Sequence, residues 1–324
     1  MAAGSKNGER SSDMKIKTLG WLIIPAIAFP SCTEKALDYR SDEGTVTIAP
    51  EWSDFACPSS ACYRFYTTDG KAVAGDGADV AASAGQFSIT LPVGGYRLLA
   101  YNTDARGVAF TGLENRHSAE IRLTSDVQPG NVYSWNVDDV NVPLRGTVQY
   151  TPVPRRLVKQ MVLHFQVTGM EEAKVLNGKM NGVYPALFLL SGEPSAESVA
   201  AAPDTRTEFT VTLTRAKAQA GNTDPAYRAS ADIRLLGLLC PDGGTSYDCR
   251  LQLQVRNSVG EAYSASVDMN ETLTDIINLY AGELPADETI EVNIGVDLMN
   301  TVLTAVVKGW TEGSGEGWVG ARKR

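Results

Sequence analysis

Apolar and polar residues alternate in short stretches along most of this chain, and residues that favour turns separate the stretches. The clearest stretch is 157–168, where Met161, Leu163, Phe165 and Val167 would share one face of a strand. Such alternation, bounded by turns, is typical of half-buried β-strands. It predicts an all-β protein. We expect strands at residues 45–48, 63–66, 86–91, 96–101, 119–123, 132–135, 157–168, 186–190, 208–214, 230–239, 250–256, 262–267, 291–296 and 302–307.

One stretch has a helical period instead. Residues 270–280 would place Leu273, Ile276, Ile277 and Tyr280 on one side of a short helix. A hinge at residues 142–154, which contains three prolines, separates two groups of strands. Short strands at regular spacing suggest sandwiches of about 100 residues or more. We therefore predict two tandem β-sandwich domains, residues 44–150 and 151–324.

The start of the chain has a different pattern. Two lysines precede an apolar run at residues 19–30, and Ser31-Cys32 follows it. This is the layout of a secretory signal peptide, and the cysteine is typical of a bacterial lipoprotein signal. The run is too short for a transmembrane helix, which needs about 20 apolar residues. We predict that residues 1–31 are extra N-terminal residues plus a signal peptide and that Met14 is the translation start.

In this interpretation Cys32 carries the lipid, palmitate included, and residues 32–43 form a tether to the membrane. Phe29 and Pro30 stand where lipoprotein signals usually have Leu and then Ala or Ser. Secretion without a lipid is therefore the alternative interpretation. Whether the lipoprotein faces the periplasm or the exterior stays open.

The charge of the chain excludes one class of partner. Its 29 Lys and Arg residues are outnumbered by 38 Asp and Glu residues. Without residues 1–31, 25 basic and 36 acidic residues remain, a formal charge of −11. Nucleic-acid binding requires a basic surface, so we expect no nucleic-acid partner. The acidic surplus favours solubility.

Besides Cys32, the chain contains four cysteines in two local pairs, Cys57 with Cys62 and Cys240 with Cys249. Each pair brackets turn-forming residues. In an oxidising compartment such pairs are typical of disulfides, each stabilising by roughly 2–3 kcal/mol. Free thiols are the alternative, and a zinc site is disfavoured because neither pair has the C-x2-C spacing.

Candidate catalytic residues are scarce. The only histidines are His117 and His164, and no Gly-x-Ser-x-Gly, His-Glu-x-x-His or P-loop motif occurs. We expect a protein that is not an enzyme and that uses no metal or cofactor. The first half is rich in aromatic residues, which we expect in the core, although exposed rings could stack on sugars. These are Trp52, Tyr63, Phe65, Tyr66, Tyr96 and Tyr101.

Several segments together carry a resemblance to a known family. They are Cys32, LPVGGYRLLAYN at 91–102, PRRLV at 154–158, VTGME at 167–171 and VVKGW at 306–310. With them the chain resembles the fimbrial anchor and assembly lipoproteins of Bacteroidales, the fimbrillin-like proteins and relatives of minor fimbrium subunits. The resemblance implies two transthyretin-like Greek-key β-sandwiches, anchored by lipid at the outer membrane and placed in a fimbrium.

The resemblance also implies a function. Such a subunit anchors or assembles a fimbrium, and so serves adhesion and pilus biogenesis, by exchanging β-strands with other fimbrial subunits. Residues 302–307, near the chain end, are our candidate for the edge strand. The alternative is a surface glycan-binding lipoprotein that uses aromatic side chains. The sequence names neither the fimbrial partner, nor a host ligand, nor the subunit's position as anchor, stalk or tip.

Overall fold

A computed structural model describes residues 42–73, 79–124, 128–217, 226–239, 249–280, 286 and 288–312. Residues Ser41–Arg324 form one compact unit. Cys32, the predicted leader and most of the predicted tether lie outside the described residues, as does Cys240. Among the residues described, no helix is long and apolar enough to cross a membrane.

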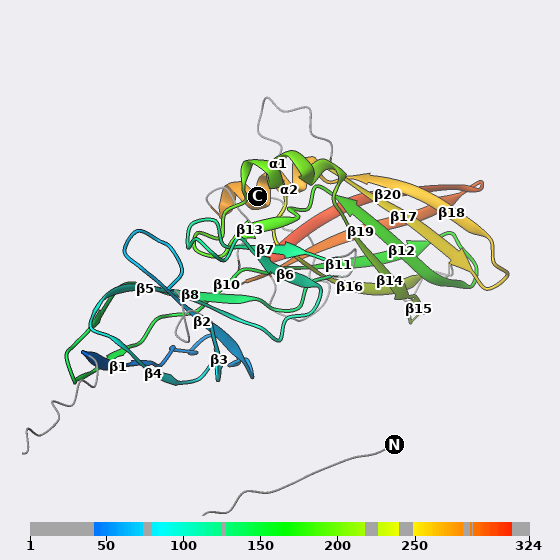
Figure 1. Ribbon diagram of the computed structural model, residues 1–324. Helices are drawn as coiled ribbons and strands as arrows, with labels where there is room; N and C mark the ends of the chain where they lie inside the picture. Colours follow the sequence, from blue (N-terminus) through cyan, green and yellow to red (C-terminus); the bar gives the residue numbers. More distant parts are fainter. Residues whose placement is uncertain are drawn as a thin grey trace, which may run out of the picture. The chain divides into compact units, whose positions relative to one another are not determined.

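The first half of this unit contains two facing sheets (Figure 1). A three-stranded sheet has the order β4-β1-β9, and a five-stranded sheet has the order β10-β8-β5-β2-β3. Their bounds are β1 Glu43–Ile48, β2 Ala61–Tyr66, β3 Asp79–Ala82, β4 Phe87–Pro92, β5 Gly94–Asn102, β8 Tyr133–Val142, β9 Thr147–Tyr150 and β10 Arg155–Arg156.

An aromatic core fills the space between these two sheets. Tyr63 stacks on Phe87 with ring centroids 4.5 Å apart, and Trp135 meets Tyr63 edge-on at 5.7 Å. Val46 and Ile48 of β1 are completely buried against them. Large aromatic side chains bury the most area per residue, so they can hold a small sandwich together.

The five-stranded sheet is also covered on its other face. A small sheet of order β13-β7-β6 contributes to this second core, with bounds β6 Val108–Thr111, β7 Glu120–Leu123 and β13 Ala186–Phe188. Tyr66 and Leu99 point into it and are fully buried with Ile121 and Leu189. Because both faces of this sheet are covered at β2, this strand is buried at five of its six positions.

Strands from beyond residue 150 thus complete sheets of the first half. β10 pairs with β8, and β13 pairs with β7. The division into domains 44–150 and 151–324 remains a prediction.

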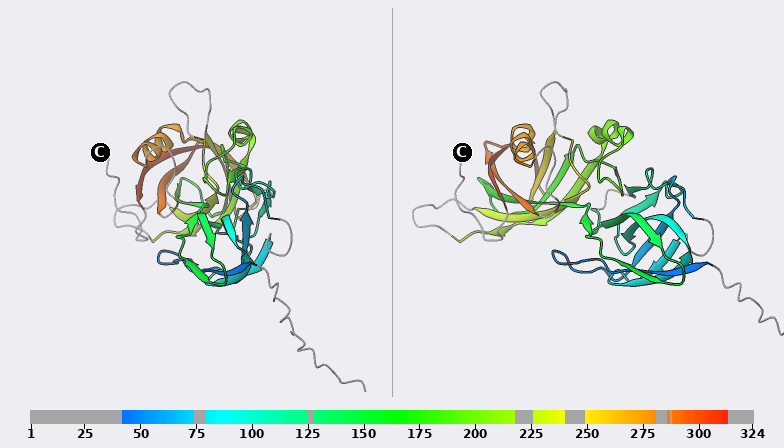
Figure 2. Two further views of the ribbon diagram at one scale, coloured as in Figure 1. Left: turned by 60° about the vertical axis from the view of Figure 1, so that its left-hand side comes forward. Right: turned by 90° about the vertical axis from the view of Figure 1, so that its left-hand side faces the viewer.

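The second half is a larger sandwich of two sheets, shown from two more sides in Figure 2. Their orders are β15-β16-β11-β19-β20 and β14-β12-β17-β18. The bounds are β11 Lys159–Thr168, β12 Ala173–Asn181, β14 Arg206–Thr212, β15 Thr214–Arg215, β16 Tyr227–Leu235, β17 Arg250–Asn257, β18 Ala262–Asp268, β19 Thr289–Met299 and β20 Val302–Glu312. In the ranges that the structure describes, the helices are α1, Ala196–Ala201, and α2, Asn270–Leu279, and a 3-10 turn, η1, spans Ala202–Asp204.

Two features predicted for this sandwich are confirmed. Along β11 every second residue is buried, and Met161, Leu163, Phe165 and Val167 all face the core. The predicted helix is α2, whose Leu273, Ile276 and Ile277 join the same core. The all-β fold class is therefore confirmed, with strands at or near every predicted position.

Candidate functional site

The edge strand β20 is the first candidate site. Among the described strands it is hydrogen-bonded only to β19, so its other edge has backbone N–H and C=O groups that join no ladder with a described strand. β18 of the facing sheet lies close to β20. β20 is the strand, at residues 302–307, that the sequence marked as a candidate edge. Unpaired strand edges attract other strands and are usually blocked or covered.

Exposed apolar side chains lie near this edge, on the face of the sheet that points away from the core. Val302 is 60% exposed and Val306 is 49% exposed, although alternating residues of the same strand, such as Leu303, are buried. Met299, directly opposite Val302 on β19, is 64% exposed. Asn300 and Thr301, both at positive φ, make the two-residue turn between these strands, as in a hairpin with a type I′ turn. A tight turn therefore holds this apolar strip at the tip of the hairpin.

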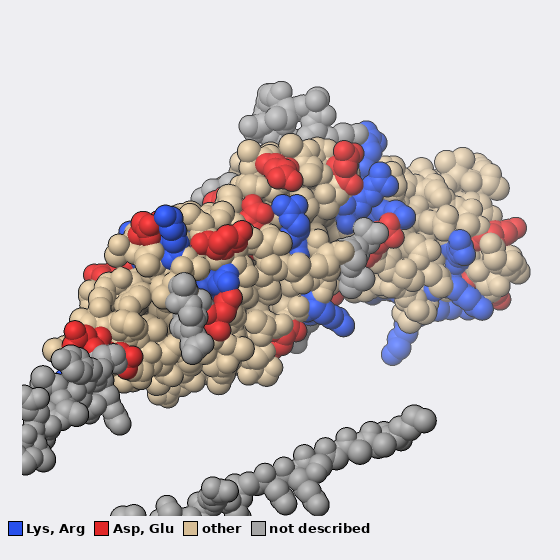
Figure 3. All heavy atoms as spheres, in the orientation of Figure 1, with Lys and Arg blue, Asp and Glu red and all other residues tan. Residues whose placement is uncertain are grey.

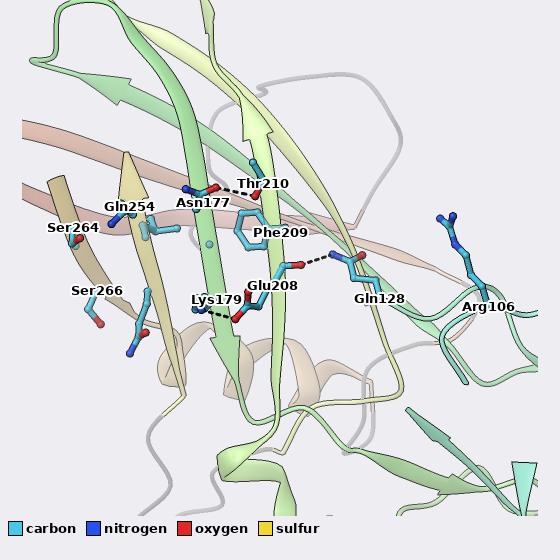
Figure 4. A pocket seen from close by; sticks show the side chains of 14 residues that line it. Arg106, Gln128, Asn177, Lys179, Glu208, Phe209, Thr210, Gln254, Ser264 and Ser266 are labelled. Atoms are coloured by element: carbon cyan, nitrogen blue, oxygen red, sulfur yellow. Dashed lines mark hydrogen bonds and ion pairs between the residues drawn. The ribbon is translucent and has the colours of Figure 1, made fainter. Parts of the chain in front are cut away.

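A second candidate site is a polar hollow of about 1020 Å³ on the outward face of the sheet β14-β12-β17-β18 (Figure 4). The register aligns one row of four side chains across these strands and a second row two residues away. The rows are Thr210, Asn177, Gln254, Ser264 and Glu208, Lys179, Gln252, Ser266.

On the outward face of the other sheet, His164 links three strands. Its Nδ1 lies 2.8 Å from the Ser230 hydroxyl, and its Nε2 lies 3.1 Å from Glu291 Oε2. The register explains this contact, because Ser230 is the direct cross-strand partner of His164 and Glu291 is a diagonal neighbour. Cross-strand pairs of this kind stabilise sheets. His164 thus faces its neighbouring strands. His117 follows a turn, where the Asn115 side chain accepts a hydrogen bond from the His117 backbone N–H.

The predicted disulfide between Cys57 and Cys62 is not formed, which corrects the sequence-based prediction. Cys57 is exposed next to Gly85, beside the aromatic core, whereas Cys62 lies in the second core on the opposite face of β2. Adjacent residues of a strand point to opposite faces, and Tyr63 takes the face toward Cys57. The thiol of Cys62 instead donates a hydrogen bond to Asp79 at 3.3 Å.

The other two cysteine predictions involve residues outside the described ranges. Cys240 lies outside the described residues, so the pair with Cys249 stays a prediction. The lipidation of Cys32 stays a prediction for the same reason. In the described ranges, no three His, Cys, Asp or Glu side chains gather as a metal site would require.

The aromatic residues of the first half do not form an exposed platform for sugars. Tyr63, Phe65, Tyr66, Tyr96 and Tyr101 are all buried. Trp52 is half-buried, and its indole N–H donates a 3.0 Å hydrogen bond to the Ala84 carbonyl. The expectation that these rings belong to the core is confirmed, and a glycan site would have to use other residues.

Charged side chains of both signs are mixed on the face seen in Figure 3. One ion pair is unusual because Arg116, only 3% exposed, donates to Asp138, which is 75% exposed. This hydrogen bond holds the pKa of the Asp138 carboxyl below its usual range. Arg116 Nε is buried and has no hydrogen-bond partner within the described residues. Asp138 therefore gives a buried cation its anionic partner.

Comparison with protein families gives one match. The family model described as a domain of unknown function, DUF5119, matches residues 31–202, which is more than half of the chain. The protein belongs to this DUF5119 family. A search of curated protein sequences found no match.

Comparison with solved structures supports the fold. A Bacteroides thetaiotaomicron protein described as a "putative adhesin" aligns with a TM-score of 0.52 and 11% identity, over 84% of this chain and 96% of its own. The fimbrial anchor protein Mfa2 from Porphyromonas gingivalis aligns with a TM-score of 0.48 and 12% identity, over 83% and 97%. A Bacteroides ovatus "putative adhesin" gives 0.47 and 16%, over 79% and 93%. At the level of fold, the first of these alignments confirms the resemblance found in the sequence.

Proposed function

We propose that this protein is a non-enzymatic surface lipoprotein that anchors or assembles a fimbrium by accepting a β-strand from another subunit. The observation that carries the proposal is the edge of β20, to which no described strand is hydrogen-bonded, although β18 of the facing sheet lies close to β20. The adhesin-like fold and the sequence resemblance to fimbrial lipoproteins support it.

Strand addition suits this edge for two reasons. The backbone groups of an edge strand supply affinity through main-chain hydrogen bonds, whatever the sequence of the incoming strand. The exposed Val302 and Val306 side chains then offer apolar contacts at two positions four residues apart, which would help to set the register. Such an edge is otherwise an aggregation hazard, so a dedicated partner is expected.

The membrane attachment in this proposal depends on Cys32. The apolar run before it and the small residue Ser31 support cleavage at this cysteine. A single acyl chain binds a membrane only marginally, so stable anchoring needs more than one chain. We propose a multiply acylated Cys32 at the outer membrane, with residues 33–43 as the tether.

Photo-crosslinking tests the edge. A benzoylphenylalanine at position 306 should crosslink to a fimbrial subunit in native cells, identified by mass spectrometry. The matched control is position 259, also a valine, 77% exposed in the turn after β17. Equal adducts at both positions, or none at position 306, would contradict strand acceptance at β20.

A second experiment tests the anchor separately. Replacing Cys32 by Ala should move the protein from the membrane fraction to the soluble fraction and remove the acyl mass from its N-terminal peptide. An unmodified Cys32 in the wild-type protein would refute the lipid anchor and leave the β20 edge still to be judged by crosslinking.

A further inference from the structure

The polar hollow on the sheet β14-β12-β17-β18 lies on the opposite sheet from β20 (Figure 4). We propose that it binds a neutral, hydroxyl-rich ligand, namely an uncharged oligosaccharide. Such binding would be an activity additional to strand exchange and independent of it.

Half of the side chains in the two rows already satisfy one another. Thr210 donates a 2.8 Å hydrogen bond to Asn177, and Lys179 pairs with Glu208 at 2.6 Å. The charges of the second pair cancel locally, so the floor of the hollow has no net charge from these residues. Gln128 reaches over from another segment and donates a hydrogen bond to the backbone carbonyl of Glu208 at 3.4 Å.

The other half has unused hydrogen-bonding capacity. In the part of the chain that the structure describes, Gln252, Gln254, Ser264 and Ser266 make no side-chain hydrogen bond to another protein group. Two amides and two hydroxyls supply both donors and acceptors. Because the rows are two residues apart, they repeat at about 6.8 Å along the strands, and neighbouring strands lie about 4.8 Å apart. A ligand that spans the rows must therefore present neutral hydroxyl or amide groups along its length.

The same chemistry disfavours other ligands. A peptide usually gains specificity from pockets for alternate side chains, and the outward side chains of both rows are polar. A polyanion would require a cluster of cations, whereas Lys179 is already paired and Arg106 stands at the margin of the hollow. An uncharged sugar chain needs neither apolar pockets nor a net charge.

A binding assay with the full chain tests this inference. The probes are neutral oligosaccharides prepared from dextran and from mannan, with a polygalacturonate oligosaccharide as the charged comparison. We expect retention of at least one neutral probe and weaker retention of the polygalacturonate. The double variant Gln252→Ala/Gln254→Ala should bind the retained probe at least about tenfold more weakly, because two hydrogen-bonding side chains are lost.

The control variant is Gln149→Ala, which removes an exposed glutamine from β9 in the other sandwich. It should leave binding unchanged, and the far-UV circular dichroism of both variants should match wild type. The inference is overturned if no neutral probe binds, if polygalacturonate binds best, or if the double variant binds as wild type does. Crosslinking at position 306 would be unaffected by these outcomes, so this inference and the proposed function can fail separately.

Discussion

The ring of Phe209 on β14 lies directly over Gly178, its cross-strand partner on β12. A Cβ atom on Gly178 would lie only 1.9 Å from Cζ of this ring, and Phe209 itself stacks 5.8 Å from Phe165 in the core. Only glycine leaves room for this arrangement. We expect Gly178→Ala to lower the free energy of unfolding by about 1–3 kcal/mol, because the ring must move off a packed position.

Urea unfolding measures this effect. Gly85→Ala is the matched control, since a Cβ there meets only the Cys57 and Ser83 side chains at 3.7 Å. Its free energy of unfolding should stay within about 0.5 kcal/mol of wild type. Equal stability of the Gly178 variant and wild type would show that the Phe209 ring is free to move.

A substitution in the hairpin turn between β19 and β20 should stabilise the protein. Thr301 has φ of +69°, a conformation that a β-branched residue rarely adopts. We expect Thr301→Gly to raise the free energy of unfolding by about 0.5–1 kcal/mol, because relief of this strain outweighs the extra freedom of the unfolded chain. Thermal unfolding gives the measurement, and Asn300→Gly is the comparison, since asparagine already tolerates its φ of +49°. A lower melting temperature for Thr301→Gly would contradict the expected strain.

The Arg116–Asp138 pair predicts a pH dependence. The pKa of Asp138 is lowered in the folded state by the hydrogen bond from Arg116. The stabilisation is therefore present above the unfolded pKa of about 3.9 and is lost as the pH falls through the lower folded pKa. Because Asp138 is 75% exposed, water screens the pair, and we expect Asp138→Asn to destabilise by only about 1 kcal/mol at pH 7.

Chemical denaturation at pH 7 and below pH 4 measures this difference, which should shrink at the lower pH. The neighbouring variant Asp139→Asn should change stability by less than about 0.5 kcal/mol at pH 7. An Asp138→Asn effect that grew on acidification would have the wrong sign for this ion pair.

The two cysteines of the first sandwich should react differently. Cys57 is exposed, whereas burial raises the pKa of the Cys62 thiol to about 11, helped by its hydrogen bond to Asp79. The thiolate is the reactive form, so at pH 8 iodoacetamide should label Cys57 in the folded protein and Cys62 only after unfolding. Peptide mapping reads out the result. A Cys57–Cys62 disulfide in the map would contradict the separation of these thiols on opposite faces of β2.

Alternation in the sequence predicted those strands that have one face in water. β11 and β19 alternate cleanly, and both were expected. β12 was not predicted as a strand. Its sequence AKVLNGKMN contains two asparagines and a glycine, which are poor strand formers. The register with Phe209 explains the glycine, but that register involves a residue 31 positions away and is not visible locally.

Of the two candidate sites, the sequence predicted the strand of one and gave no sign of the other. The strand β20 was predicted from its β-branched and apolar residues, and its pairing with β19 alone places it at the edge of its sheet. The polar hollow was not predictable, since the eight side chains of its two rows come from four strands and gather only through the pairing register. The prediction of a Cys57–Cys62 disulfide failed because short spacing says nothing about which face of a strand each cysteine occupies. Cys62 faces the second core, to which segments on both sides of residue 150 contribute, such as Ile121 and Leu187.

Hydrogen exchange of the backbone amides in β20 tests the central claim most directly. The measurement compares the purified chain with the same chain in native fimbriae, and β17, paired on both sides by β12 and β18, serves as the internal standard. If another subunit adds a strand here, amides of Val302–Glu312 will exchange more slowly in the fimbriae while those of β17 stay unchanged. Equal exchange of β20 in the two samples would contradict strand addition at this edge.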